Sequence, residues 1–289
     1  MAELIGLPLG RRVGFRECAN CGLAFFDLRY SEEQAERLYQ GYRDSEYVRV
    51  RRSWEPWYGK RVNDAYTPGS EPVQHRVRFA SRVLAQAGLT RPLRCAVDFG
   101  GDQGQFFPDV PIERRVVVEL SEKQLLAGVE RAPSLQGLSE YPELVIAAHV
   151  LEHLSDPRDL LSEIRSVLAA DGFLYVEVPL DRPRVRAWHR KRAYATWTGK
   201  VSGRRWTFVP IDFVSGVARQ FGLTTPRLGV VKESEHINFF NSSSLRKMLE
   251  LSGFEVKAEL AEPDARVGGL RLGRLGMAAV PRQSANEKG

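Results

Sequence analysis

Apolar residues recur along the chain with two different periods, and the pattern changes near Gly88. Before this point the helical period dominates. Ser31 opens a capping-box pattern that leads into a helical apolar face, and residues 71–87 show a second helical pattern that Gly88 ends. Residues 42–66 lie between the two, rich in Arg, Trp and Tyr and with little periodicity, so we expect an irregular cover or linker there. The pattern predicts a small N-terminal lobe over residues 1–70.

Farther along the chain, short apolar strands alternate with helices, which is typical of an α/β fold with a parallel sheet covered on both faces. The strands are expected at residues 94–99, 115–119, 144–149, 173–179, 254–260 and 275–280. Helices are expected after Asp156, which precedes Pro157 and suits the N-cap position, and over residues 242–251. These elements predict one large domain over residues 71–280, and the polar tail over 281–289 is expected to be disordered.

A glycine-rich segment follows the first of these strands. It runs from Gly100 to Gly104 as Gly-Gly-Asp-Gln-Gly, and the next strand ends in Glu119, 19 positions after Gly100. At the carboxyl edge of a doubly wound sheet, such a loop brings a ligand close to main-chain N–H groups, and an acid ending the next strand accepts ribose hydroxyls. The pair therefore predicts a cofactor that contains a nucleoside. Because the loop lacks two glycines of the dinucleotide fingerprint and the Gly-Lys-Ser/Thr of a P-loop, both of those classes are disfavoured.

The strand and its loop resemble the D-x-G-x-G-x-G segment of the class I S-adenosylmethionine-dependent methyltransferases. Asp98, Gly100 and Gly104 match this segment, and Asp102 stands in place of the middle glycine; aspartate tolerates unusual backbone angles better than most residues. The resemblance implies that Asp98 and the loop backbone hold the methionine end of S-adenosylmethionine, and that Glu119 holds its ribose. The expected cofactor-binding residues are Asp98, Gly100, Gly101, Asp102, Gly104, Glu119 and His149.

Two further segments resemble the small-molecule branch of the same family. Residues 145–179 are similar to its fourth strand, the helix that follows and its fifth strand, and residues 235–256 are similar to the turn, helix and sixth strand at its end. The resemblance implies a Rossmann-like seven-stranded methyltransferase sheet that is mostly parallel, with an antiparallel last strand. Residues 181–235 lie where this fold commonly carries an inserted substrate cap.

The candidate catalytic groups are histidines. Methyl transfer from a sulfonium needs in-line placement of the acceptor, and a base if the acceptor is a hydroxyl or a carbon acid. In the sugar C-methyltransferases that residues 235–256 resemble, a histidine at the position of His236 has the base role, so we expect His236 to be catalytic. Its candidate orienting acids and a weaker candidate base are Glu233, Glu235 and Tyr194. The other histidines are expected to touch the cofactor (His149), to fix its loop (His153) or to lie at the surface (His75 and His189).

The net charge of +6 and the pI of about 9.3 suggest an anionic partner. The excess is concentrated in residues 43–61 and 182–205, and the second stretch interleaves arginines with Trp and Tyr inside the expected cap. Arginine suits phosphates, and aromatic side chains stack on a base or a sugar ring. We therefore expect an anionic small-molecule or glycan acceptor; the alternatives are a solvated cationic face and single-stranded RNA. No RNA-binding module is recognisable, which disfavours nucleic acid.

Cys18 and Cys21 have the one cysteine spacing of chemical interest. Two cysteines so spaced supply half of a tetrahedral zinc site, and the segment around them resembles a cut-down form of the zinc-ribbon module of some sugar methyltransferases. A second pair is missing from residues 1–17, and burial in a central strand explains Cys95. The sequence therefore disfavours zinc.

The composition indicates the cellular compartment of the protein. Three cysteines argue against a disulfide framework, no apolar run reaches the length of a bilayer span, and Met1–Gly10 lacks the features of a signal peptide. We therefore expect a cytoplasmic protein without a membrane span.

The sequence as a whole predicts an S-adenosylmethionine-dependent methyltransferase that modifies a sugar, nucleotide-sugar or glycan acceptor in saccharide or natural-product biosynthesis. Two alternatives stay open. One is a catalytically inactive binding subunit of the same fold, suggested by Asp102 in the loop and by the incomplete cysteine module. The other is an RNA methyltransferase that uses the basic, aromatic cap.

Overall fold

In the computed structural model, the described residues are 14–42, 44–56, 58–59, 66–121, 123–180, 200, 204–220, 236–263, 266–267, 270–271 and 273–282. Most of the expected cap over 181–235 lies outside these residues, as do the first ten residues and nearly all of the expected disordered tail over 281–289. Pro281 itself closes a strand, and the N–H of Arg282 donates to the carbonyl of Gly253.

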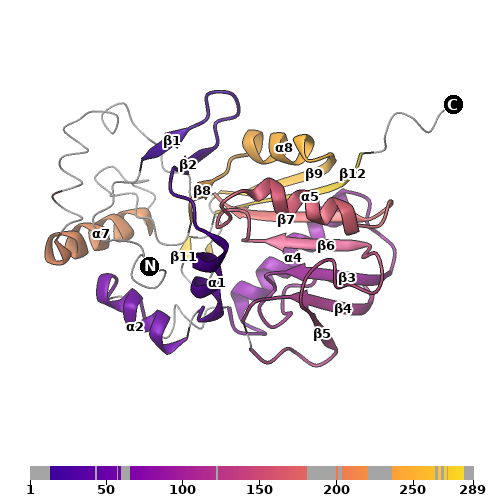
Figure 1. The fold of residues 1–289 in the computed structure, drawn as a ribbon, viewed down its shortest axis with the longest axis horizontal. Coiled ribbons are helices and arrows are strands. Elements are labelled where there is room, and N and C mark those ends of the chain that lie inside the picture. The colour runs from indigo at the N-terminus through magenta and orange to yellow at the C-terminus, as the bar shows by residue number, and fades with distance from the viewer. Residues whose placement is uncertain are drawn as a thin grey trace.

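A seven-stranded sheet forms the centre of the molecule (Figure 1). Its strand order is β5-β4-β3-β6-β7-β12-β9, and all neighbouring pairs are parallel except those of β12, which runs antiparallel to both β7 and β9. The mostly parallel sheet with an antiparallel last strand is thus confirmed. The strands are β3 (Leu93–Phe99), β4 (Ile112–Val118), β5 (Val129–Ala132), β6 (Leu144–Ala148), β7 (Phe173–Pro179), β9 (Phe254–Glu262) and β12 (Arg274–Pro281).

Six of these seven strands lie where the apolar pattern predicts them, and β5 is the exception. Only one of its four residues, Ala132, is buried. A strand this short, at the edge of the sheet, carries no run of apolar residues that the sequence could reveal.

Helices cover the two faces of the sheet, as expected for the predicted fold. Alternate residues of β6 point to opposite faces: Val145 and Ala147 pack in the core beneath α5 and α8, whereas Leu144 and Ile146 pack beneath α4. Figure 1 shows α5 in front of the sheet and α4 behind it. The covering helices are α4 (Glu71–Gln86), α5 (Pro157–Val167) and α8 (Ser242–Leu251).

The ends of these helices form where the sequence predicts them. The side chain of Asp156 accepts a hydrogen bond from the backbone of Arg158 at the start of α5, and Asn241 forms a capping box with Ser244 at the start of α8. Gly88 follows α4 with a φ of 94°, a left-handed conformation that favours glycine. Local chemistry therefore determines these boundaries.

The N-terminal residues form a second, three-stranded sheet together with a strand from the far end of the chain. β2 pairs with β1 on one side and with β8 on the other, so Ile237 and Phe239 share an apolar core with Phe26 and Leu28. Ser31 caps the following helix through the predicted capping box with Gln34. These elements are β1 (Phe15–Glu17), β2 (Ala24–Phe26), α1 (Glu32–Gln40) and β8 (Asn238–Phe239).

The expected irregular segment over residues 42–66 is wrong in part, because α2 (Ser45–Trp54) is a regular helix. Asp44 caps it by accepting a hydrogen bond from the N–H of Tyr47 at 2.7 Å, and Tyr47 and Val50 are buried on one face. Aromatic and arginine side chains make up much of that face, so a count of apolar residues does not reveal its period.

Two further elements lie outside both sheets described so far. The helix α7 (Arg205–Gln220) lies within the expected cap and contacts α2, while β10 (Arg266–Val267) and β11 (Leu270–Arg271) form a short antiparallel pair. Among the described helices, none combines the length and the apolar character that crossing a bilayer requires.

Candidate active site

The glycine loop leaves the carboxyl end of β3 and passes directly over Asp98. A Cβ atom on Gly101 would lie only 2.5 Å from the carboxyl carbon of Asp98, so glycine at this position leaves room for the carboxylate. Asp102 has a φ of 54°, the left-handed conformation that aspartate tolerates. Asp102 thus adopts the unusual backbone angle that aspartate was expected to tolerate, and its part in cofactor binding stays a prediction.

The carboxylate of Asp98 is 1% exposed, and its Oδ2 atom has no hydrogen-bond partner among the described residues. Burial raises the pKa of Asp98 to about 8, against the positive charge of Arg76 and with the help of the negative charges of Glu119 and Asp102. A buried carboxylate without donors is unfavourable. The position therefore fits a ligand that brings its own N–H donors and positive charge.

Glu119 lies directly after β4 and is bound to the glycine loop. Its two carboxylate oxygens accept hydrogen bonds from the N–H groups of Asp102 and Ser121, each at 3.0 Å. Lys123 also pairs with Asp102 at 2.9 Å. The structure thus brings the predicted acid and the predicted loop together, and the carboxylate keeps lone pairs that can accept further hydroxyl donors.

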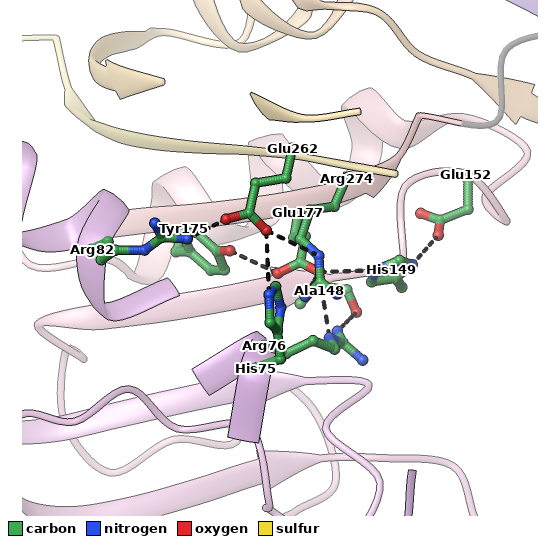
Figure 2. A network of polar contacts seen from close by, with 10 residues as sticks. All are labelled: His75, Arg76, Arg82, Ala148, His149, Glu152, Tyr175, Glu177, Glu262 and Arg274. Carbon is green, nitrogen blue, oxygen red and sulfur yellow. Dashed lines mark hydrogen bonds and ion pairs between the residues drawn. The ribbon is translucent and has the colours of Figure 1, made fainter. Parts of the chain in front are cut away.

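His149 follows β6 and occupies an unusual backbone conformation, with a φ of 60°. Its N–H donates to the carbonyl of Glu177 at 2.8 Å, and its ring lies between two buried acids (Figure 2). Nε2 is 2.9 Å from Glu177 Oε1, and Nδ1 is 3.2 Å from Glu152 Oε1. Burial and the charge of Arg76 lower the pKa of His149, but its contacts with the two acids outweigh them, so the pKa is raised and the imidazolium is favoured.

Glu177 is the centre of a buried network that the sequence did not reveal (Figure 2). Arg76 Nε lies 3.4 Å from its Oε1 and Arg274 Nη1 lies 3.6 Å from the same atom, while the hydroxyl of Tyr175 donates to Oε2 at 2.7 Å. One signal was available: a charged residue inside an otherwise apolar, doubly covered strand requires partners. The sequence could not say which cations supply them.

His75 was expected at the surface, and the structure bears this out only in part. Its side chain is only 27% exposed and its Nε2 lies 3.7 Å from Glu262, which also pairs with Arg82 (Figure 2). Burial and the charge of Arg274 lower the pKa of His75. The helical period of α4 turns this position toward the edge of the sheet instead of toward solvent.

His236 lies beside residues 152 and 153, far from it in the sequence. The carbonyl of Glu152 accepts hydrogen bonds from the N–H groups of Ile237 and Asn238, at 2.8 and 3.0 Å. The rings of His153 and His236 then meet edge to face, with their centroids 4.8 Å apart. The predicted loop histidine and the predicted base are therefore parts of one cluster with Glu152.

The environment of His236 keeps its ring neutral. Burial and the charge of His153 lower the pKa of His236 to about 3, although the charge of Glu152 opposes this. A neutral imidazole is in the proton-accepting form, but a pKa this low makes it a weak proton acceptor. Its candidate partners Glu233, Glu235 and Tyr194, and also His189, lie outside the described residues.

Comparison with known proteins decides the family. Residues 73–259 match the family model described as the methyltransferase domain. The chain belongs to this methyltransferase family. It is an S-adenosylmethionine-dependent methyltransferase of class I, so the predicted reaction type and cofactor are confirmed.

Several solved structures are similar to this methyltransferase. The 1,6-didemethyltoxoflavin-N1-methyltransferase of Burkholderia thailandensis is 14% identical, with a TM-score of 0.49 over 94% of this chain and 100% of that chain. The N-methyltransferase NodS of Bradyrhizobium japonicum WM9 is 12% identical, with a TM-score of 0.43 over 73% of this chain and 98% of that chain. Identities this low say nothing about the acceptor. Among curated proteins, no sequence matches the chain.

The ends of β3 and β4 fit S-adenosylmethionine. The Oδ2 atom of Asp98, which has no hydrogen-bond partner among the described residues, suits an ammonium group, and the carboxylate of Glu119 suits a pair of ribose hydroxyls. Both acids also place negative charge near a cofactor whose sulfonium is positive. The assignment of single residues to parts of the cofactor stays a prediction.

The cysteine pair of this methyltransferase forms a tight turn. Cys18 donates its N–H to Leu23 and accepts from the N–H of Gly22, both at 2.8 Å. Hydrogen bonds from the backbone of Cys21 and Asn20 lower the pKa of the Cys18 thiol. Within the described part of the chain, no third Cys, His, Asp or Glu joins the two sulfur atoms in a metal-sized group.

Proposed function

We propose that this methyltransferase acts on an anionic sugar, nucleotide-sugar or glycan acceptor in saccharide or natural-product biosynthesis in the cytoplasm. S-adenosylmethionine, when bound, supplies a methyl group on a positively charged sulfonium. One observation carries the cofactor half of the proposal: the Oδ2 atom of the buried Asp98 has no hydrogen-bond partner among the described residues, and Gly101 leaves room above its carboxylate.

The residues divide the work between two ends of the site. Asp98 binds the amino group of the cofactor, and Glu119 binds its ribose while also holding the backbone of Asp102 in place. At the other end, His236 faces the acceptor in its neutral form and takes the proton of a hydroxyl group. Glu152 beside it stabilises the imidazolium that results, because its charge favours the protonated ring.

We assign acceptor binding to the most basic stretch of the chain and to the helix that follows it. Residues 182–205 carry seven arginines and two tryptophans, side chains that suit a phosphorylated sugar. Beside them, α7 presents Trp206 with 77% of its surface exposed, a side chain suited to stacking on a sugar ring. This chemistry favours an anionic saccharide over an uncharged acceptor.

Isothermal calorimetry with S-adenosylmethionine and its demethylated product tests the cofactor site. We expect micromolar binding by the unmutated chain, and a loss of about tenfold or more in Glu119→Gln, because two charge-assisted hydrogen bonds to hydroxyl groups are weakened. Glu113→Gln, an exposed acid on the same strand, is the matched control and should bind as the unmutated chain does. Equal affinities in all three proteins would refute the site.

Formation of the demethylated product identifies the acceptor. Nucleotide-linked sugars, acidic oligosaccharides and single-stranded RNA are each incubated with the enzyme at low and high salt. Turnover of the sugars supports the proposal. Turnover of RNA with a steep salt dependence would replace it by RNA methylation.

A further inference from the structure

The cluster of Glu152, His153 and His236 has the composition and size of a metal site. Each residue offers one ligand atom, and the three atoms lie within 4.8 Å of one another. Two ligands of one ion, at bond lengths of about 2.1 Å, lie roughly 3–4 Å apart. The cluster therefore needs to close by only about an ångström to bind an ion.

The carboxylate of Glu152 is aimed into this cluster and pairs on its other side with His149 (Figure 2). The residue is 0% exposed, and neither oxygen accepts a well-oriented hydrogen bond from the described residues. His149 Nδ1 and His153 Nε2 lie 3.2 and 3.8 Å from Oε1. His149 shares its positive charge with Glu177, so part of the charge of this fully buried carboxylate is left for a further positive group to compensate. A bound cation would provide that compensation.

The backbone holds the three ligands on a rigid frame. Glu152 and His153 lie in the turn after β6, and the N–H groups of Ile237 and Asn238 bind the carbonyl of Glu152. The side chain of Asn238 is buried and donates to the carbonyls of Leu151 and Leu154, at 3.1 and 2.7 Å. Ligands fixed in this way lose little entropy on binding an ion.

From this arrangement we infer that Glu152, His153 and His236 bind a divalent transition-metal ion such as Zn²⁺ or Mn²⁺. Two imidazole nitrogens and one carboxylate oxygen suit these ions, whereas Mg²⁺ and Ca²⁺ prefer oxygen ligands throughout. Three protein ligands leave coordination positions open, as in catalytic sites. The ligand expected at an open position is a hydroxyl or phosphate oxygen of the acceptor.

The location relates the metal site to the cofactor loop. Val150 lies in the same turn as the ligands and packs against Gly100 of the cofactor loop. A Cβ atom added to Gly100 would lie 3.1 Å from Cγ2 of Val150. The inference deepens the proposed function and rests on it for the role of the ion. His236 would then act on the acceptor through the ion instead of taking the proton itself, because a bound metal ion lowers the pKa of a hydroxyl group that coordinates it.

The first experiment measures metal binding by the full chain with the substitutions Cys18→Ser and Cys21→Ser. These substitutions remove the cysteine pair, so that it cannot contribute to the zinc binding that is measured. After treatment with EDTA, the protein is titrated with Zn²⁺, Mn²⁺ and Mg²⁺ by calorimetry. We expect one equivalent of Zn²⁺ to bind, Mn²⁺ to bind more weakly and Mg²⁺ not to bind measurably. Absence of Zn²⁺ binding, or binding of Mg²⁺ as tightly as Zn²⁺, would overturn the inference.

Ligand variants then assign the site. In His153→Asn and Glu152→Gln, Zn²⁺ affinity should fall by more than about 100-fold, the upper end of the loss caused by residues that merely orient a ligand. His75→Asn is the matched control, since His75 also lies beside a glutamate but is not one of the three residues of the cluster. Unchanged affinity in both ligand variants would show that the ion binds elsewhere.

Cobalt provides a readout that does not depend on the folding of the ligand variants. Co²⁺ added to the Cys18→Ser/Cys21→Ser protein should give the visible absorption of a nitrogen and oxygen ligand set, and that absorption should change when the acceptor is added. A spectrum like that of free Co²⁺ would contradict the inference. Cofactor calorimetry on the same sample keeps the two hypotheses apart: intact cofactor binding without metal binding refutes the metal site alone.

Discussion

Two buried carboxylates at the same edge of the sheet have opposite character. Asp98 near the end of β3 and Glu177 near the end of β7 are each 1% exposed, and both point to the face that α4 covers. Burial raises the pKa of Asp98 to about 8. Burial also raises the pKa of Glu177, but the charge of Arg76, the contact with His149 and the charge of Arg274 together lower it to about 2.

The difference lies in the partners and not in the burial. Glu177 is surrounded by two arginines, a histidine and a tyrosine that the protein itself supplies. Asp98 has Arg76 as a more remote positive charge, and its Oδ2 atom has no hydrogen-bond partner among the described residues. The protein thus compensates the charge of Glu177 within the fold and leaves Asp98 without such compensation, a contrast that is typical of functional sites.

The largest expected effect is the loss of stability in Glu177→Gln. The substitution leaves Arg76 and Arg274 buried without their acid, so the free energy of unfolding at pH 7 should fall by about 3–5 kcal/mol in urea denaturation. The folded-state pKa of Glu177 is depressed, so its contribution is present above about pH 4.5 and is lost as the pH falls toward 2. The difference between the two proteins should therefore shrink at low pH.

An exposed ion pair gives the control for this prediction. The Nζ atom of Lys257 lies 2.6 Å from Oε1 of Glu255, and both side chains are exposed. Glu255→Gln should change the free energy of unfolding by less than about 1 kcal/mol. If Glu177→Gln were equally mild, the network would not stabilise the fold and the comparison would fail.

Asp98→Asn should have the opposite effect on stability and abolish tight cofactor binding. The folded-state pKa of Asp98 is raised, so its stability contribution is present below about pH 4 and is lost as the pH rises through 8. Asn does not titrate, so the variant should gain on the order of 5 kcal/mol relative to the unmutated chain between pH 4 and pH 9, at about 1.4 kcal/mol for each unit of the pKa difference. Denaturation at a series of pH values measures the gain, and cofactor affinity should fall by at least about tenfold. A constant stability difference would show that Asp98 is ionised throughout.

Gly101→Ala should displace the side chain of Asp98 while keeping its carboxyl group. The added Cβ would lie 2.5 Å from the carboxylate, so the side chain must move, and we expect a loss of about 1–2 kcal/mol in stability and weaker cofactor binding. In an Asp98→Ala background the same substitution should have little effect on stability, because the clash is gone. Additive effects of the two substitutions would argue against this contact.

The smallest expected effect is that of Tyr175→Phe. The hydroxyl of Tyr175 donates one buried hydrogen bond to Glu177, and its removal should cost about 1 kcal/mol because the arginines and His149 remain. Tyr141→Phe, at a side chain with 69% exposure, should have no measurable effect. A loss as large as that of Glu177→Gln would mean that the tyrosine, and not the arginines, holds the acid.

Much of this architecture could be predicted from local patterns. The strands β3, β4, β6, β7, β9 and β12 are recognisable because their apolar runs are bounded by glycine, proline and charged residues. The strand β5 and the helix α2 were missed, because one has a single buried residue and the other buries a face that includes Tyr47. Period alone cannot identify such elements.

The site was predictable only in the parts that adjoin one another along the chain. Asp98, the glycine loop and Glu119 belong to one strand-loop-strand unit, and the structure brings them together as expected. Arg76 was missed because α4 also carries exposed arginines, and the sequence does not mark the buried one.

The sequence by itself determined the layers, the direction of the strands and the glycine loop, because periodicity and turn residues act over a few positions and encode which face is buried. Only the tertiary structure placed Arg76 and Arg274 around Glu177, paired β8 with β2, and brought His236 to Glu152 and His153. These contacts join segments far apart in the chain. Their energies depend on the distance and the burial of both partners, and neither quantity exists until the chain is folded.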